Sequence, residues 1–182
     1  MKEMFAKNSL YFMLMNDSYY KEMGNLDEFQ EDSNRGHGVM IVDINDHLIA
    51  VPLRSKLKPH FIKAPHIFAY KTYLSEGNTY LKGLDFSKTT IIEKKHVNTK
   101  VQYIFNDEEE KIFYLNNFSR LQLRITNYIK GYITLCSKIN NNEDVSSQIK
   151  KYRFTTLKNF HKELNIEISK EDFNEILRQI FP

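Results

Sequence analysis

The sequence predicts an α+β fold, in which helices from the C-terminal part of the chain pack on a compact, twisted antiparallel sheet. Short β-branched runs separated by turn residues fill residues 39–104, whereas apolar residues recur at helical spacing from about residue 117. A length of 182 residues with 41% apolar residues is enough for one domain with a real core. We therefore expect a single domain over 1–182, β-rich over 1–116 and mainly helical over 117–182.

The first part of the chain is expected to supply the strands. Residues 9–14 are compatible with an entry strand or with the first turn of a helix that runs to about Met23, and the sequence leaves both open. Residues 39–53 form the clearest hairpin, because two β-rich runs flank the turn residues Asn45 and Asp46. A basic loop is expected next, over residues 54–65. Further strands are expected at residues 67–73, 89–92 and 97–104, with a turn at 75–78.

The second part of the chain shows helical periodicity. From about Asn117, the apolar positions Leu121, Ile125, Ile129, Ile133 and Cys136 recur every three or four residues. The pattern predicts a long helix that ends near residue 140. Further helices are expected at residues 156–164 and at about 170–180, the last one capped by Ser169.

Composition excludes several classes of protein. No apolar stretch is long enough for a transmembrane helix, and the N-terminus lacks the pattern of a signal peptide, so we expect no membrane association. The single cysteine, Cys136, excludes an internal disulfide and a multi-cysteine metal site. A reducing, cytoplasmic location fits this composition.

Basic charge is concentrated in the middle of the chain. Residues 51–100 hold ten Lys/Arg against three Asp/Glu, a net +7, whereas residues 1–50 are net −5 and residues 101–182 net +1. Such a block is either a solvated basic face or a surface that binds a polyanion. The interleaved aromatic residues are compatible with base stacking and equally with a place in the core.

The segment from Arg54 to His60 is the strongest candidate for chemistry. It combines cations, a hydroxyl and an imidazole, namely Arg54, Ser55, Lys56, Lys58 and His60. If the segment is extended, Arg54, Lys56 and Lys58 share one side, and Ser55 points the other way unless the chain bends. The six histidines have no metal-binding spacing, no glycines flank Ser55 as in a nucleophile elbow, and no Walker loop is present.

RNA cleavage needs only the groups that this segment offers. RNA supplies its own nucleophile, the 2′-hydroxyl, so the protein has to move protons and stabilise charge on the phosphate. No metal or cofactor is then required. Two other readings stay open: a non-catalytic RNA-binding regulatory protein, and a protein–protein module that uses the C-terminal helices.

Four sequence blocks resemble a known family. They are Gly38–Asp43, Ala50–Ser55 with Lys58 and His60 following, Gly83–Lys88, and Tyr152–Leu157 with His161–Leu164 after it. In this order the chain resembles the toxins of type III toxin–antitoxin systems, the ToxN/AbiQ superfamily, and is most similar to the TenpN-type group. The resemblance covers about residues 36–164.

The resemblance implies a fold, an activity and partners. The fold would be partly barrel-like and related to the MazF/Kid type. The activity would be a metal-independent endoribonuclease that leaves a 2′,3′-cyclic phosphate on cellular RNA. The partner would be a small repeated RNA antitoxin, often a pseudoknot, that inhibits the toxin in a closed protein–RNA assembly. Ser55 takes the position of the family's active-site hydroxyl, whereas the lysine two residues beyond it in ToxN is replaced here by Leu57.

Residue roles follow from combining this resemblance with the chemistry. Arg54 and Lys58 are expected to neutralise the scissile phosphate, and Ser55 to hydrogen-bond it or the 2′-oxygen. His60 is the first candidate for proton transfer, Lys56 is its competitor, and Tyr19 or Tyr20 completes the site. The residues expected to hold the RNA are Arg35, His37, Lys63, Lys71, Lys82, Lys88, Lys94 and Lys95.

Overall fold

A computed structural model describes residues 9–29 and 38–181 of the protein. The strands are β1 (Tyr11–Met15), β2 (Val39–Ile44), β3 (His47–Leu57), β4 (Ile67–Ser75), β5 (Asn78–Asp85), β6 (Thr90–Ile92) and β7 (Val97–Gln102). The α-helices are α1 (Asp17–Met23), α2 (Glu108–Asn116), α3 (Phe118–Asn140), α4 (Ser146–Ile149) and α5 (Lys170–Ile180). Short 3-10 helices are η1 (Pro59–Lys63), η2 (Phe86–Lys88), η3 (Lys94–His96), η4 (Lys150–Tyr152) and η5 (Thr156–Asn159).

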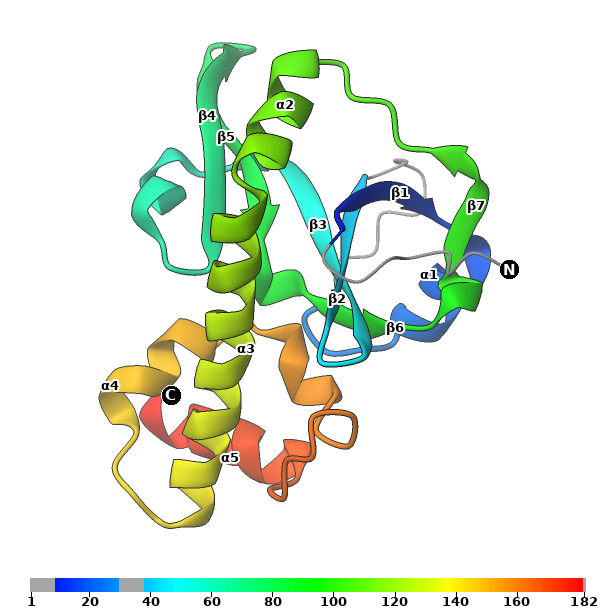
Figure 1. Ribbon diagram of the computed structural model, residues 1–182. Helices are drawn as coiled ribbons and strands as arrows, with labels where there is room; N and C mark the ends of the chain where they lie inside the picture. The colour runs from blue at the N-terminus through cyan, green and yellow to red at the C-terminus, as the bar shows by residue number, and fades with distance from the viewer. Residues whose placement is uncertain (1–8, 30–37, 182) are drawn as a thin grey trace.

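The α+β class is confirmed, with one antiparallel sheet and helices packed beside it. The sheet has seven strands in the order β4-β5-β3-β2-β1-β7, and β6 pairs with β3 beside this path. Within the described residues β4 and β7 each pair on one side only, so the sheet is not closed. The β4–β5 end and the β7 end therefore lie at opposite sides of the sheet, with α1 and η3 beside β7 (Figure 1).

The hairpin predicted at residues 39–53 is confirmed. β2 and β3 pair from Val39↔Pro52 to Ile44↔His47 around a two-residue turn. Asn45 and Asp46 have φ values of 53° and 63°, the left-handed conformation that the turn requires. Of the two alternatives left open for residues 9–14, the strand is the one that forms, as β1, and the helix α1 begins only after it, at Asp17.

The prediction of a basic loop over residues 54–65 is wrong. β3 continues to Leu57 because β5 pairs with it beyond the β2–β3 hairpin, at Leu53↔Leu84, Arg54↔Gly83 and Leu57↔Leu81. The chain then turns into η1, which lies against β4 and β5. A pairing partner from a distant segment therefore extended the strand past its last β-branched residue.

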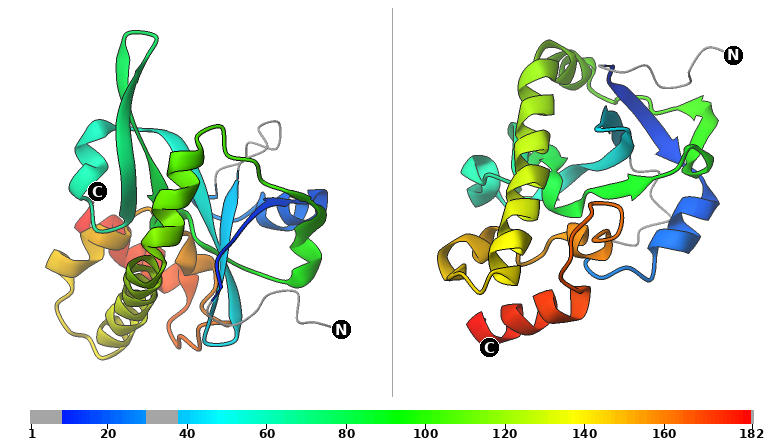
Figure 2. Two further views of the ribbon diagram at one scale, coloured as in Figure 1. Left: turned by 45° about the horizontal axis from the view of Figure 1, so that its top comes forward. Right: turned by 60° about the horizontal axis from the view of Figure 1, so that its bottom comes forward.

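The long helix predicted near residues 117–140 is confirmed as α3. Its buried side includes Leu121, Ile125, Ile129 and Cys136, and it also buries Tyr128. α3 runs from the β4–β5 end of the sheet down to the C-terminal part of the chain, where α4 and α5 gather around its end (Figures 1 and 2). The last helix is also confirmed: α5 begins after Ser169, whose side chain accepts a hydrogen bond from the Asp172 amide.

The helix expected at residues 156–164 does not form. Only η5 is helical there, and it is capped by Thr155, whose hydroxyl accepts from the Leu157 amide. The Asn159 side chain donates to the Thr156 carbonyl, which competes with continuation of the helix. Asn165 then takes a φ of 53°. The apolar residues of this segment are buried, but by turns and a short 3-10 helix instead of an α-helix.

The described helices include none with the length and apolar character needed to cross a bilayer.

Candidate functional site

The centre of the predicted site lies at a β-bulge in β3. The register between β3 and β5 shifts between Arg54 and Leu57, so one extra residue is accommodated there. Arg54 is half-buried, Ser55 and Lys56 are exposed, and Leu57 is buried again. Three consecutive side chains are thereby accessible at one point of an otherwise buried strand, as phosphate chemistry requires.

The bulge also separates Arg54 from Lys56. The Arg54 guanidinium faces the Asp85 carboxylate, whereas the Lys56 ammonium lies 5.8 Å from the ring centroid of Tyr80. Side chains alternate between the two faces along β5. Asp85 and Tyr80 are five positions apart, so they point to opposite faces of the sheet. The expectation that Arg54, Lys56 and Lys58 share one side is therefore wrong for the first two, because the bulge reverses the alternation.

Arg54 is held by a buried carboxylate. Asp85 is 5% exposed, and its Oδ2 lies 3.7 Å from Arg54 Nη1. Its Oδ1 accepts from the Ser87 amide at 3.0 Å and from the Ser87 hydroxyl at 2.6 Å. A carboxylate fixed in this way orients the guanidinium while leaving part of it accessible, since the Arg54 side chain is 25% exposed.

A row of rings joins η1 to the start of β4. The His60 ring contacts the Phe61 ring at 4.3 Å between centroids, tilted by 53°, and Phe61 contacts His66 at 5.7 Å. His60, Lys58 and Lys63 are all exposed on or beside η1. His66 is the more enclosed histidine: burial lowers its pKa, and the nearby Asp85 charge partly offsets this effect.

Two of the lysines predicted to hold RNA pair with carboxylates of the α2 segment. Lys71 and Lys82 lie directly opposite each other on β4 and β5. Lys71 Nζ lies 2.7 Å from Asp107 and Lys82 Nζ 3.2 Å from Glu110. Because like charges opposite each other destabilise a sheet, these carboxylates offset the repulsion between the two lysines. They also reduce the charge that the two lysines offer to a ligand.

Aromatic side chains cover the β4–β5 hairpin near the bulge. The Tyr73 hydroxyl donates to the Ser55 carbonyl at 2.7 Å, which ties β4 to the bulged part of β3. Tyr73 and Tyr80 pair across the hairpin with ring centroids 5.9 Å apart. The ammonium groups of Lys56 and Lys82 lie over these rings at 5.8 and 5.6 Å. Ser55, Lys56, Tyr73, Tyr80 and Lys82 are thus brought together.

Other predicted residues lie elsewhere. Lys88 Nζ donates to the Phe154 carbonyl at 3.0 Å and pairs with Glu28 at 3.2 Å, which ties η2 to the C-terminal part. Lys94 and Lys95 are on η3, next to α1, which carries Tyr19 and Tyr20. This side of the sheet is remote from the β4–β5 end (Figure 1). Arg35 and His37 lie outside the described residues.

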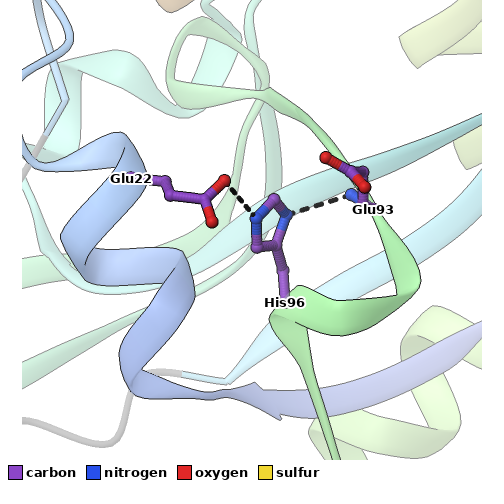
Figure 3. Close-up of side chains that lie close together, drawn as sticks. All are labelled: Glu22, Glu93 and His96. Atoms are coloured by element: carbon purple, nitrogen blue, oxygen red, sulfur yellow. Dashed lines mark hydrogen bonds and ion pairs between the residues drawn. The ribbon is translucent and has the colours of Figure 1, made fainter.

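The η3 region contains the one group of side chains with metal-ligand character in the described part of the chain: Glu22, Glu93 and His96 (Figure 3). His96 Nδ1 accepts from the Glu93 amide at 3.0 Å, so Nε2 carries the proton and donates to Glu22 at 2.9 Å. The Lys95 ammonium lies 3.3 Å from Glu22 and 3.1 Å from Glu93. With both imidazole nitrogens and both carboxylates engaged, the cluster caps η3 and fastens α1 to it.

Sequence reasoning missed several residues at the Arg54 end of the sheet. Asp85, His66, Arg124 and Lys151 come from four separate segments, and each acts electrostatically on at least one of the others. No local pattern marks them. The only signal was that Asp85 falls in the block Gly83–Lys88 that carries the family resemblance.

Comparisons with protein-family models, with curated proteins and with solved structures found no match to this chain.

Proposed function

We propose that this protein is a metal-independent endoribonuclease toxin. The observation that carries the proposal is the β-bulge at Ser55, where the consecutive side chains from Arg54 to Lys56 are each accessible and Arg54 is oriented by buried Asp85. An oriented guanidinium beside a hydroxyl suits the binding of a phosphodiester. The resemblance to the ToxN/AbiQ superfamily supplies the reaction.

The reaction uses the 2′-hydroxyl of RNA as nucleophile. Arg54 and Lys58 neutralise the scissile phosphate, on which negative charge builds up in the transition state. Ser55 donates a hydrogen bond to a phosphate oxygen or to the 2′-oxygen. A base takes the 2′-hydroxyl proton and an acid protonates the leaving 5′-oxygen. His60 is the first candidate for these transfers and Lys56 its competitor, and the products are a 2′,3′-cyclic phosphate and a 5′-hydroxyl.

The β4–β5 hairpin suits unpaired RNA near the bulge. Tyr73 and Tyr80 present rings on the same face as Lys56, and stacking on aromatic rings tolerates any base. Lys58 and Lys63 are exposed beside this hairpin, and within the described residues no ion-pair partner accompanies either of them. They are better placed to contact phosphates than Lys71 and Lys82.

The partner and the assembly rest on the family resemblance. A small repeated RNA antitoxin would inhibit the enzyme by occupying this surface, in a closed protein–RNA assembly in the cytoplasm. A relation of the open seven-stranded sheet to the MazF/Kid type, with a partly barrel-like curvature, belongs to the same proposal.

The test is a growth assay combined with mapping of RNA ends. Wild-type protein is expressed beside Ser55→Ala, His60→Ala and the matched control Ser147→Ala, an exposed serine on α4. We expect the wild type and the control to arrest growth and to leave RNA with defined cyclic-phosphate ends. Full toxicity of both folded site variants would refute the site.

A non-catalytic RNA-binding regulator is the alternative that this experiment separates. Such a protein would copurify with RNA whose ends are random, and Ser55→Ala would not change those ends. The aromatic and basic surface would serve both functions, so only the defined ends distinguish the enzyme.

A further inference from the structure

Cationic side chains from distant segments gather where the sheet meets the C-terminal part of the chain. Asp85 ends β5, and Ile67 at the start of β4 pairs with it across the sheet. Arg124 of α3 donates to the Ile67 carbonyl at 2.9 Å and to the Pro65 carbonyl at 3.3 Å. The guanidinium of Arg124 is therefore anchored at the same sheet end as the Asp85 carboxylate.

Lys151 on η4 contacts a residue of the same helix, α3. Its ammonium lies 5.2 Å from the ring centroid of Tyr128, which is itself close enough to Asp85 to be affected by that charge. His66 is affected by the charges of Asp85, Lys151 and Lys88 together. The Phe86 ring links the two cations, because it lies 5.8 Å from the Arg124 guanidinium carbon and 6.1 Å from the Tyr128 ring, between centroids.

Positive charge exceeds negative charge at this junction. The buried carboxylate at this junction, Asp85, already faces an arginine of β3, and Lys88 pairs with Glu28 at 3.2 Å. Neither Arg124 nor Lys151 has an ion-pair partner within residues 9–29 and 38–181. Two cations thus contact the paired rings of Phe86 and Tyr128 without a counterion from the described residues.

Both of these cations are also partly removed from water. Burial lowers the pKa of Lys151, and repulsion from Arg124 lowers it further. Burial likewise lowers the pKa of Arg124. A desolvated ammonium beside a guanidinium is costly on its own, and an anion bound between them would stabilise both charged forms.

We propose that Arg124 and Lys151 form a second phosphate-binding site, which holds an RNA backbone phosphate next to the scissile one. The choice of RNA as ligand rests on the proposed function. Phosphate fits because a guanidinium recognises its oxygens with fixed geometry and ammonium groups add point charges. The site adjoins Arg54 through Asp85, so one strand of RNA can span both.

The test measures RNA binding without cleavage. A 2′-O-methyl RNA oligonucleotide, which lacks the nucleophile, is titrated by fluorescence anisotropy over a range of salt concentrations. Lys151→Gln removes the charge but keeps most of the stem over the tyrosine ring, and Lys150→Gln changes the exposed neighbour on η4 as a matched control. Circular dichroism melts verify folding.

We expect Lys151→Gln to weaken binding about tenfold and to reduce the slope of log K against log salt by about 0.7, the effect of one phosphate contact on single-stranded nucleic acid. Lys150→Gln should bind as the wild type does. Equal slopes and affinities for wild type and Lys151→Gln would overturn the proposal, as would a wild type that does not bind the oligonucleotide.

A second measurement needs no variant. Inorganic pyrophosphate is added to wild-type protein while the ring signals of His66 are followed by NMR, with sodium chloride at matched ionic strength as control. A pyrophosphate-specific shift supports the site and no shift contradicts it. If pyrophosphate shifts the His66 signals but Lys151→Gln binds the RNA as tightly as the wild type does, the site binds phosphate and RNA is not its ligand. Lys151-dependent RNA binding by a protein that leaves unmodified RNA intact would refute the nuclease and retain the site.

Discussion

Replacing His161 by leucine should strongly destabilise the C-terminal part of the protein. The imidazole is 8% exposed, with Nδ1 2.8 Å from the Ile168 carbonyl oxygen and Nε2 2.6 Å from the Tyr132 hydroxyl oxygen. Because a carbonyl can only accept, Nδ1 carries the proton and Nε2 accepts from the hydroxyl. Burial raises the pKa of Tyr132, which keeps this hydroxyl protonated.

The expected magnitude follows from the groups left behind. Leucine can satisfy neither the Ile168 carbonyl nor the Tyr132 hydroxyl, and each buried unpaired group costs about 1–3 kcal/mol. The Cys136 sulfur beside Tyr132 is a weak acceptor and compensates only in part. We therefore expect His161→Leu to lower the free energy of unfolding by about 2–5 kcal/mol, a large share of the total for a protein of this size.

Urea unfolding of four proteins measures this effect. They are the wild type, His161→Leu, Tyr132→Phe and the double variant. Because the double variant has no orphaned hydroxyl, its loss should be smaller than the sum of the single losses by about 1–2 kcal/mol. A loss below about 0.5 kcal/mol for His161→Leu, the level of a surface substitution, or strict additivity in the double variant would refute this account of the histidine.

Three further outcomes are expected. Lowering the pH through the usual imidazole pKa of 6.5 should reduce stability. Burial lowers the pKa of His161 in the folded protein, so the unfolded chain binds the proton at a higher pH. Thermal melts whose midpoint does not change with pH would contradict this. Gly83→Ala should destabilise the sheet by about 2 kcal/mol or more in urea unfolding, because a Cβ there would lie 2.6 Å from the Phe68 carbonyl oxygen. An unchanged unfolding midpoint would show instead that β4 can move away. Glu76→Asn should raise stability by about 0.5 kcal/mol in the same assay, because Glu76 has a φ of 52°, which asparagine tolerates better. A lower unfolding midpoint would contradict the turn assignment.

Local patterns predicted those elements whose stability is local. The β2–β3 hairpin followed from Asn45-Asp46 between two β-rich runs, and α3 followed from an apolar stripe over many turns. The helix expected at residues 156–164 does not form because side chains in this segment hydrogen-bond to backbone carbonyls. Asn159, for example, donates to the Asp27 carbonyl, which lies far away in the sequence. Apolar spacing indicates which residues are buried and does not by itself say in which backbone conformation.

The same distinction applies to the candidate site. The Arg54–His60 segment could be found from the sequence because its residues are contiguous. The bulge that separates Arg54 from Lys56 depends on pairing with β5, and the carboxylate that faces Arg54, Asp85, also comes from β5. Basic composition likewise located the cationic region without revealing that Lys71, Lys82, Lys88 and Lys95 each pair with a carboxylate.

The most direct test of the central claim is cleavage of a defined RNA by purified protein in the presence of EDTA. We predict cleavage that needs no divalent cation, fragments that end in a 2′,3′-cyclic phosphate, and a rate for Ser55→Ala that is lower by about 100-fold, the usual effect of removing one hydrogen-bond donor to developing charge. Cleavage that strictly requires added magnesium, or no cleavage by a protein that binds the RNA, would contradict the account.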